Sequence, residues 1–148
     1  LFNLGVDVKV VEMPSSTRTA EEAASAVGCH VGQIVKSLVF RARSSGKAVL
    51  VLASGLNRVD VARVGAALGE PIDRADADFA REQTGFAIGG IPPVAHSQPL
   101  VTFMDEDLLQ YDEVWAAAGT PHAVFPIQPG RLAEVSNARV LAVRQEKA

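Results

Sequence analysis

The segment from Thr84 to Pro93, Thr-Gly-Phe-Ala-Ile-Gly-Gly-Ile-Pro-Pro, limits most strongly what this chain can fold into. Its glycines and prolines disfavour both a helix and a central strand, because glycine adds chain entropy and proline removes a backbone donor. The sequence therefore predicts a shaped loop, in which Gly89 and Gly90 would let backbone N–H groups approach a ligand closely. The same composition also fits an ordinary connection between two elements.

Length and composition indicate one globular domain, which we expect to span residues 1–148. Hydrophobic residues make up 48% of the chain and charged residues 21%. No run approaches the roughly 18 to 20 apolar residues that a membrane span needs, and the first residues lack the basic region and cleavage site of a signal peptide. These features predict a cytoplasmic protein with no membrane partner.

Charge and cysteine content argue against several kinds of site. The net charge is −3, whereas a protein that binds nucleic acid mainly through phosphate contacts would be basic. Any contact with nucleic acid must therefore be local and weak. Cys29 is the only cysteine, which excludes an internal disulfide and a cysteine-rich zinc site. The histidines His30, His96 and His122 show no metal-ligand spacing. We therefore expect no metal and no cofactor.

The apolar pattern predicts strands interspersed with short helices. Alternation over Val6–Val11 is typical of a half-buried strand. Further strands are predicted over residues 33–42, 48–53, 100–104, 113–118, 122–127 and 139–143, and helices over residues 20–27, 61–68, 76–83 and 129–135. Thr19 and Glu22 form a capping box, and Asp60 caps the second helix. Six or seven strands with adjacent hairpins indicate a single α+β domain with a mixed sheet.

Lys36 is the strongest single candidate for a functional residue. It lies in the otherwise apolar strand 33–42, and lysine is rarely buried without a partner or a function. Strand alternation also permits Lys36 to lie on a solvent face. Asp105 could orient Lys36 or His122, or it could simply cap the helical turn that follows it, which is the simpler interpretation.

Two motifs together resemble a known family. Gly-Gly-Ile-Pro-Pro, preceded by Thr84-Gly85 and paired with the upstream Ile34-Val35-Lys36-Ser37-Leu38, resembles the YbaK/EbsC family over nearly the whole chain. That family comprises free-standing aminoacyl-tRNA deacylases and the editing domain inserted in bacterial prolyl-tRNA synthetases. The resemblance implies a mostly antiparallel, barrel-like sheet and a cytoplasmic enzyme that hydrolyses the ester of a mischarged aminoacyl-tRNA without a cofactor.

The resemblance also implies roles for individual residues. Lys36 would lie in the active-site pocket and fix the acceptor end, and Gly119 with His122 would line the acyl pocket. Backbone donors at Gly89 and Gly90 would stabilise the tetrahedral oxyanion. The nucleophile would be water or the 2′-hydroxyl of the terminal adenosine. The predicted catalytic residues are Lys36, Gly89 and Gly90, and the predicted substrate-binding residues are Ile91, Pro92, Pro93, Asp105, Gly119 and His122.

The sequence says less about which aminoacyl-tRNA would be the substrate. Val124 stands where cysteine-specific members of the family carry an aspartate, and Ala95 stands where many relatives have glycine. The turn Gly119–His122 looks more like the alanine-clearing synthetase domain, which favours tRNA(Pro) carrying alanine, with serine or cysteine as weaker substrates. A non-catalytic module that binds tRNA ends or a synthetase, and a hydrolase of another small acyl ester, fit the same sequence. The need for a synthetase in trans and the roles of His30 and His96 stay open.

Overall fold

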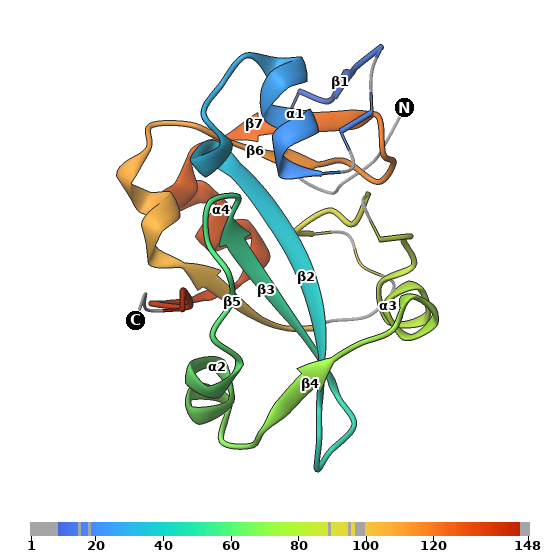
Figure 1. Ribbon diagram of the computed structural model, residues 1–148, viewed down its shortest axis with the longest axis vertical. Coiled ribbons are helices and arrows are strands. Elements are labelled where there is room, and N and C mark those ends of the chain that lie inside the picture. Colours follow the sequence, from blue (N-terminus) through green and yellow to red (C-terminus); the bar gives the residue numbers. More distant parts are fainter. Residues whose placement is uncertain are drawn as a thin grey trace.

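One mixed sheet forms the centre of the protein (Figure 1). The computed structural model describes residues 9–14, 16–17, 19–88, 90–94, 96 and 100–145. In this part of the chain the sheet has eight strands: seven follow the order β1-β7-β6-β2-β3-β5-β8, and β4 pairs with β2 outside that path. The strands are Val11–Glu12 (β1), Ile34–Ala42 (β2), Ala48–Ser54 (β3), Ile72–Arg74 (β4), Val101–Asp105 (β5), Val114–Ala117 (β6), Ala123–Ile127 (β7) and Arg139–Leu141 (β8). The helices are Ala20–Val27 (α1), Val61–Leu68 (α2), Ala77–Thr84 (α3) and Pro129–Ser136 (α4), with 3-10 helices at Val31–Gln33 (η1) and Glu106–Gln110 (η2).

The pairing of the strands confirms a single α+β domain with a mixed sheet. Strands β2 and β3, β6 and β7, β1 and β7, and β2 and β4 pair antiparallel. Strands β2 and β6, β3 and β5, and β5 and β8 pair in parallel. The end strands β1 and β8 of the path do not pair with each other in the described part of the chain. The longest strands, β2 and β3, therefore lie in the middle, and β2 carries Lys36.

Helix boundaries follow the predicted caps closely. The Thr19 hydroxyl accepts a hydrogen bond from the backbone of Glu22 at the start of α1, and the Glu22 side chain completes the capping box. At the start of α2 the Asp60 carboxylate accepts hydrogen bonds from the backbone N–H groups of Ala62 and Arg63. Both helices end at a glycine in the left-handed region, Gly28 with φ 84° and Gly69 with φ 99°, where residues with a Cβ are disfavoured.

Two strands differ from the predicted set. Strand β4 was not expected, because a three-residue strand behind Pro71 is too short to show an alternating pattern. It pairs with the last residues of β2, placing Arg74 opposite Phe40. The predicted strand Val6–Val11 lies largely outside the described residues, within which β1 covers only Val11–Glu12. The edge strand β4 matters for the site, because it places a cationic side chain beside β2.

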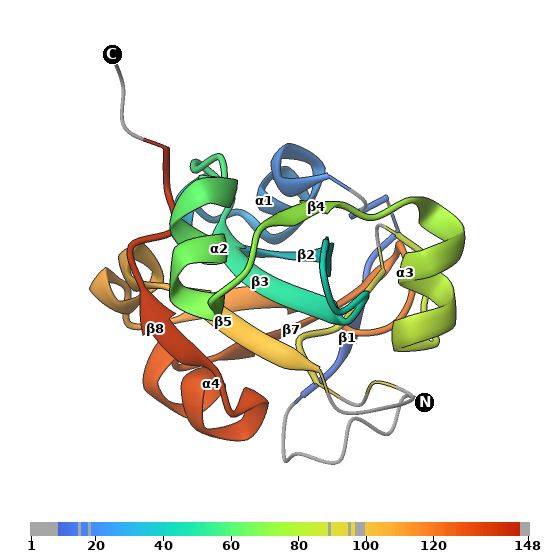
Figure 2. The same cartoon turned by 90° about the horizontal axis from the view of Figure 1, so that it is seen from below.

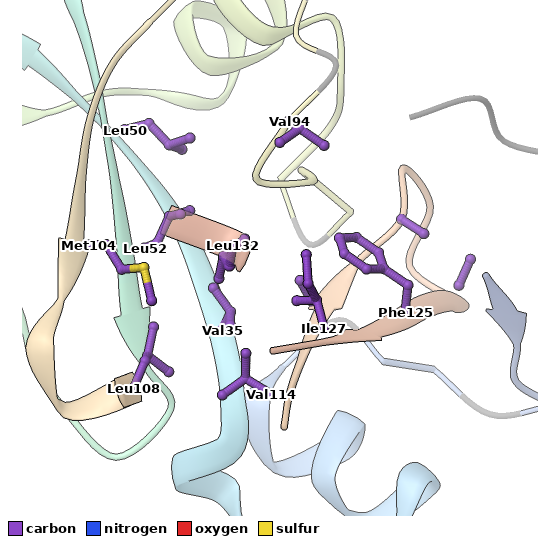
Figure 3. Packing of buried hydrophobic residues seen from close by; sticks show 13 residues of the cluster. Val35, Leu50, Leu52, Val94, Met104, Leu108, Val114, Phe125, Ile127 and Leu132 are labelled. Atoms are coloured by element: carbon purple, nitrogen blue, oxygen red, sulfur yellow. The ribbon is translucent and has the colours of Figure 1, made fainter. Parts of the chain in front are cut away.

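The core lies on both faces of the sheet. Every residue of β3 is buried, and alternate side chains enter different clusters. Leu50 and Leu52 pack with Leu132 of α4 (Figure 3), whereas Val51 packs with Val64 of α2. Figure 2 shows α2 and α4 on opposite sides of the sheet. Strand β2 is less completely covered, and its central residues 36–39 are only half-buried.

Candidate active site

A cavity of about 320 Å³ opens beside the middle of β2, and we call it the Lys36 cavity. Its walls come from the start of α1, from β2, β6 and β7, and from the loop between α3 and β5. The polar side chains in its lining belong to Thr17, Thr19, Glu21, Lys36 and Ser37. The larger apolar side chains in its lining belong to Ile34, Val35, Leu38, Ile88, Ile91, Trp115 and Val124. The fold thus places the predicted lysine in a small, mostly apolar hollow.

The Lys36 ammonium is held by a neutral group. Its Nζ donates a hydrogen bond of 2.5 Å to the main-chain carbonyl of Asn57. Among the described residues, no carboxylate lies within ion-pair distance of it. Burial lowers the pKa of Lys36 below its ordinary value; the carboxylates of Glu21 and Asp105 oppose this effect, and Arg58 reinforces it. An ammonium carries three donors, so two N–H groups remain for a ligand.

The carbonyl that receives Lys36 is itself fixed by a buried carboxylate. The Asn57 side-chain amide donates to Asp105 Oδ2 and to Asp107 Oδ2, both at 2.8 Å. Asp105 Oδ2 also accepts the backbone N–H of Ser54 at 3.0 Å. These bonds hold the turn after β3 against the end of β5. The position of the ammonium therefore depends on residues that do not line the cavity.

Asp105 combines two of the roles that its sequence position left open. Its Oδ1 accepts the backbone N–H of Asp107 at 2.9 Å and so caps η2. Through Asn57 it also positions Lys36, but it makes no bond to His122 in the described part of the chain. Asp105 is 0% exposed. The fold thus places it behind the cavity wall in this conformation, and its role in substrate binding stays a prediction.

The catalytic role of Gly90 stays a prediction, and the structure shows how its backbone is placed. Its N–H donates to the carbonyl of Ala87 at 3.1 Å, so in this conformation it has no proton left for an oxyanion. A Cβ on Gly90 would lie 2.8 to 3.0 Å from three backbone atoms of Thr120. Glycine is thus needed here because the loop packs directly on the turn before β7. Gly89 lies outside the described residues.

The rest of the Gly-Gly-Ile-Pro-Pro motif is buried. Ile91 is 4% exposed and lines the Lys36 cavity. Pro92 and Pro93 do not line it. The carbonyl of Pro92 instead accepts a hydrogen bond of 2.6 Å from Nε2 of His96, and burial lowers the pKa of that histidine. Of this motif, the described residues bring only Ile91 to the cavity wall.

The turn from Gly119 to His122 supports the cavity from outside. Gly119 has φ 109°, which requires glycine, and neither Gly119 nor His122 lines the cavity. The backbone N–H and the hydroxyl of Thr17 donate to the Pro121 carbonyl at 2.6 and 3.0 Å. His122 is exposed, and its carbonyl accepts the backbone N–H of Met13 at 2.7 Å. The turn therefore holds Thr17 in place, and Thr17 lines the cavity.

Several lining residues were not identified from the sequence. Thr17 and Glu21 lie beside the capping box. Helix capping alone accounts for polar residues at this place, so the sequence gives no reason to expect that they contact a ligand. Ser37 directly follows Lys36, and its buried Oγ has no hydrogen-bond partner in the described part of the chain, so it is a further candidate for substrate contact. Asn57 follows a buried strand in a turn, and no local pattern distinguishes it from an ordinary turn residue.

The other reactive side chains lie away from the Lys36 cavity. Burial raises the pKa of the Cys29 thiol, which reduces its thiolate fraction. Cys29 and His30 line a separate hollow beside Trp115. Among the described residues, no group of three histidine, cysteine or acidic side chains could hold a metal ion. No helix in the same residues is long and apolar enough to cross a membrane.

Comparisons with known proteins agree on one kind of domain. Residues 14–135 match the model of the aminoacyl-tRNA editing domain. A crystal structure of a proposed trans-editing enzyme for prolyl tRNA synthetase is 52% identical, covers 94% of this chain and 87% of that chain, and has a TM-score of 0.88. The uncharacterized protein YwhH of Bacillus subtilis (strain 168) is 28% identical over 88% of this chain and 83% of its own length. The proline–tRNA ligase of Limosilactobacillus fermentum (strain NBRC 3956 / LMG 18251) is 31% identical over 61% of this chain but only 16% of the ligase.

Proposed function

The chain belongs to the aminoacyl-tRNA editing domain family, and on this premise we propose that it hydrolyses the ester bond of a mischarged aminoacyl-tRNA. The proposed substrate is tRNA(Pro) carrying a small noncognate amino acid, with alanine favoured over serine and cysteine. The proposed reaction takes place in trans to a prolyl-tRNA synthetase, as has been proposed for the similar protein of known structure. The observation that carries the proposal is the Lys36 ammonium, with two unused donors, at the wall of a small apolar cavity.

The shape and lining of the cavity support a small acyl group. A volume of about 320 Å³ is at the lower end for ligand pockets. Ile88, Ile91, Trp115 and Val124 contribute apolar walls, which suit a methyl group better than a hydroxyl. A pocket gains only about 1 to 3 kcal/mol per methylene, so an editing site discriminates best by refusing larger groups sterically. The ring of the cognate prolyl ester would meet these walls.

The proposed chemistry needs little from acid–base groups. The nucleophile is water, which the 2′-hydroxyl of the terminal adenosine can orient by a hydrogen bond; the water adds to the ester carbonyl carbon and gives up a proton. The bond from that carbon to the ribose oxygen then breaks, and the ribose oxygen takes up a proton. Because the ester is already activated, positioning and stabilisation of the oxyanion could supply most of the rate. Lys36 would hold the acceptor end, and Gly89 remains the proposed backbone donor to the oxyanion.

Deacylation of a panel of charged tRNAs tests this function. Transfer RNA(Pro) carrying alanine, serine, cysteine or proline is incubated with the protein at one concentration, and the intact ester is measured over time. Hydrolysis of the alanyl ester first, with the prolyl ester spared, is expected. Binding of the charged tRNA without hydrolysis would indicate a non-catalytic module instead.

A further inference from the structure

A second cavity of about 730 Å³ adjoins the first along β2, and we call it the arginine cavity. It shares Lys36 and Leu38 with the Lys36 cavity, so the two meet on the same strand. One side comes from the segment between β3 and α2, and another from β4, which pairs with the end of β2 (Figure 1). The remaining lining residues are Phe40, Arg58, Val59, Val61, Ile72, Asp73, Arg74 and Gln145.

The arginine cavity carries an excess of unpaired positive charge. Its basic residues are Lys36, Arg58 and Arg74, and its one carboxylate, Asp73, is already bound by Arg43 through two hydrogen bonds of 2.8 and 3.1 Å. In the described part of the chain, neither Arg58 nor Arg74 has a carboxylate within ion-pair distance.

Two further arginines of the described chain pair with carboxylates. Arg63 lies near Asp60, and Arg144 bonds to Asp107. The whole chain has a net charge of −3. A generally basic surface therefore does not explain why two unpaired guanidinium groups line one cavity. A guanidinium group can donate two parallel hydrogen bonds to two oxygens of one phosphate.

We propose that the arginine cavity binds the phosphodiester backbone at the 3′ end of the tRNA, while the aminoacyl ester lies in the Lys36 cavity. This inference rests on the proposed function. The ribose that bears the ester also carries, through its 5′ oxygen, the first phosphate of the chain. A phosphate site must therefore adjoin the ester site, and the arginine cavity does so at Lys36. Arg58 and Arg74 are the proposed phosphate ligands, and Lys36 lies between the two parts of the substrate.

The activity test compares two substrates that carry the same ester. Alanyl-tRNA(Pro) has the phosphates, whereas the alanyl ester of adenosine has none. Arg58→Gln and Arg74→Gln are each expected to raise the KM for alanyl-tRNA roughly threefold to tenfold. The slope of log KM against the logarithm of the salt concentration should fall by about 0.7 to 0.9 for each phosphate that the variant no longer binds. The effect of either substitution on hydrolysis of the adenosine ester should be several-fold smaller. Equal effects on both substrates would overturn the proposal.

Arg131→Gln is the matched control, because Arg131 is an exposed arginine on α4 that lines neither cavity. It should leave the hydrolysis of both substrates unaffected. A rise in the KM for alanyl-tRNA as large as that of Arg58→Gln would mean that overall charge, not this cavity, attracts the RNA.

A binding measurement separates this inference from the proposed function. The probe is an uncharged, fluorescently labelled acceptor-stem hairpin with the single-stranded 3′ end of tRNA(Pro), titrated at several salt concentrations. Weaker binding and a smaller salt dependence in Arg58→Gln and Arg74→Gln would support the phosphate site even if no ester were hydrolysed. Unchanged binding by both variants would refute it, even in a protein that deacylates tRNA.

Discussion

Lys36 of β2 and Asn57, 21 residues later in the turn after β3, are joined by a hydrogen bond from the lysine ammonium to the asparagine main-chain carbonyl. The side chain of Asn57 is in turn held by two carboxylates from the end of β5 and the start of η2. Three segments that are distant in the sequence thus determine where one cation lies.

Asn57→Ala should therefore lower deacylation without removing any group from the cavity wall. The variant keeps the carbonyl but loses both side-chain bonds, which leaves the buried Asp105 with fewer donors and costs about 1 to 3 kcal/mol of unfolding free energy. We expect a fall in kcat of roughly tenfold at a temperature where the variant is fully folded. Gln110→Ala is the control, because among the described residues that amide bonds only to the Asp107 carbonyl. Wild-type kcat in folded Asn57→Ala would show that the turn does not position Lys36.

Gly90→Ala should destabilise the protein through the contact between the loop and the turn before β7. The new Cβ would lie within 3.0 Å of the backbone of Thr120, and overpacking of this kind costs about 1 to 3 kcal/mol. Gly130→Ala, at a helical position with no atom within 4 Å of the added Cβ, should be neutral or slightly stabilising. Urea unfolding of the two variants measures the difference. Equal stabilities would mean that the loop moves away from Thr120 at little cost.

The activity should fall on the alkaline side at a lower pH than an ordinary lysine would give. Burial lowers the pKa of Lys36 from 10.5, so the ammonium loses its proton, and with it the charge, as the pH rises through that lowered value. The rate of spontaneous ester hydrolysis is measured alongside and subtracted. In Lys36→Arg any remaining activity should lack this alkaline fall, because a guanidinium stays charged throughout the range. The same fall in both proteins would assign it to another group.

Local signals in the sequence were sufficient to predict most of the elements. Caps such as Thr19 with Glu22 and Asp60 act within one helical turn, and β3 is an unbroken apolar run, so each could be read from neighbouring residues. Strand β4 has no such signal, because only Ile72 of its three residues is buried and the strand exists through pairing with β2.

The site was only partly predictable, because it depends on contacts between distant segments. Lys36 stood out as a charge in an apolar strand, and the structure places it at a cavity. The sequence could not show that Gly90 packs on Thr120, or that Asp105 reaches Lys36 through Asn57. Arg58 and Arg74 also have no local pattern in common, and only the pairing of β4 with β2 brings them to one cavity.

Single-turnover hydrolysis of alanyl-tRNA(Pro) and prolyl-tRNA(Pro) by the wild-type protein and by Lys36→Ala tests the central claim most directly. Lys36 is only half-buried, so its removal should leave the thermal unfolding temperature nearly unchanged. We predict that the wild-type protein hydrolyses the alanyl ester much faster than the prolyl ester, and that folded Lys36→Ala loses most of the alanyl activity. Prolyl hydrolysis as fast as alanyl hydrolysis, or near wild-type activity in Lys36→Ala, would contradict the account.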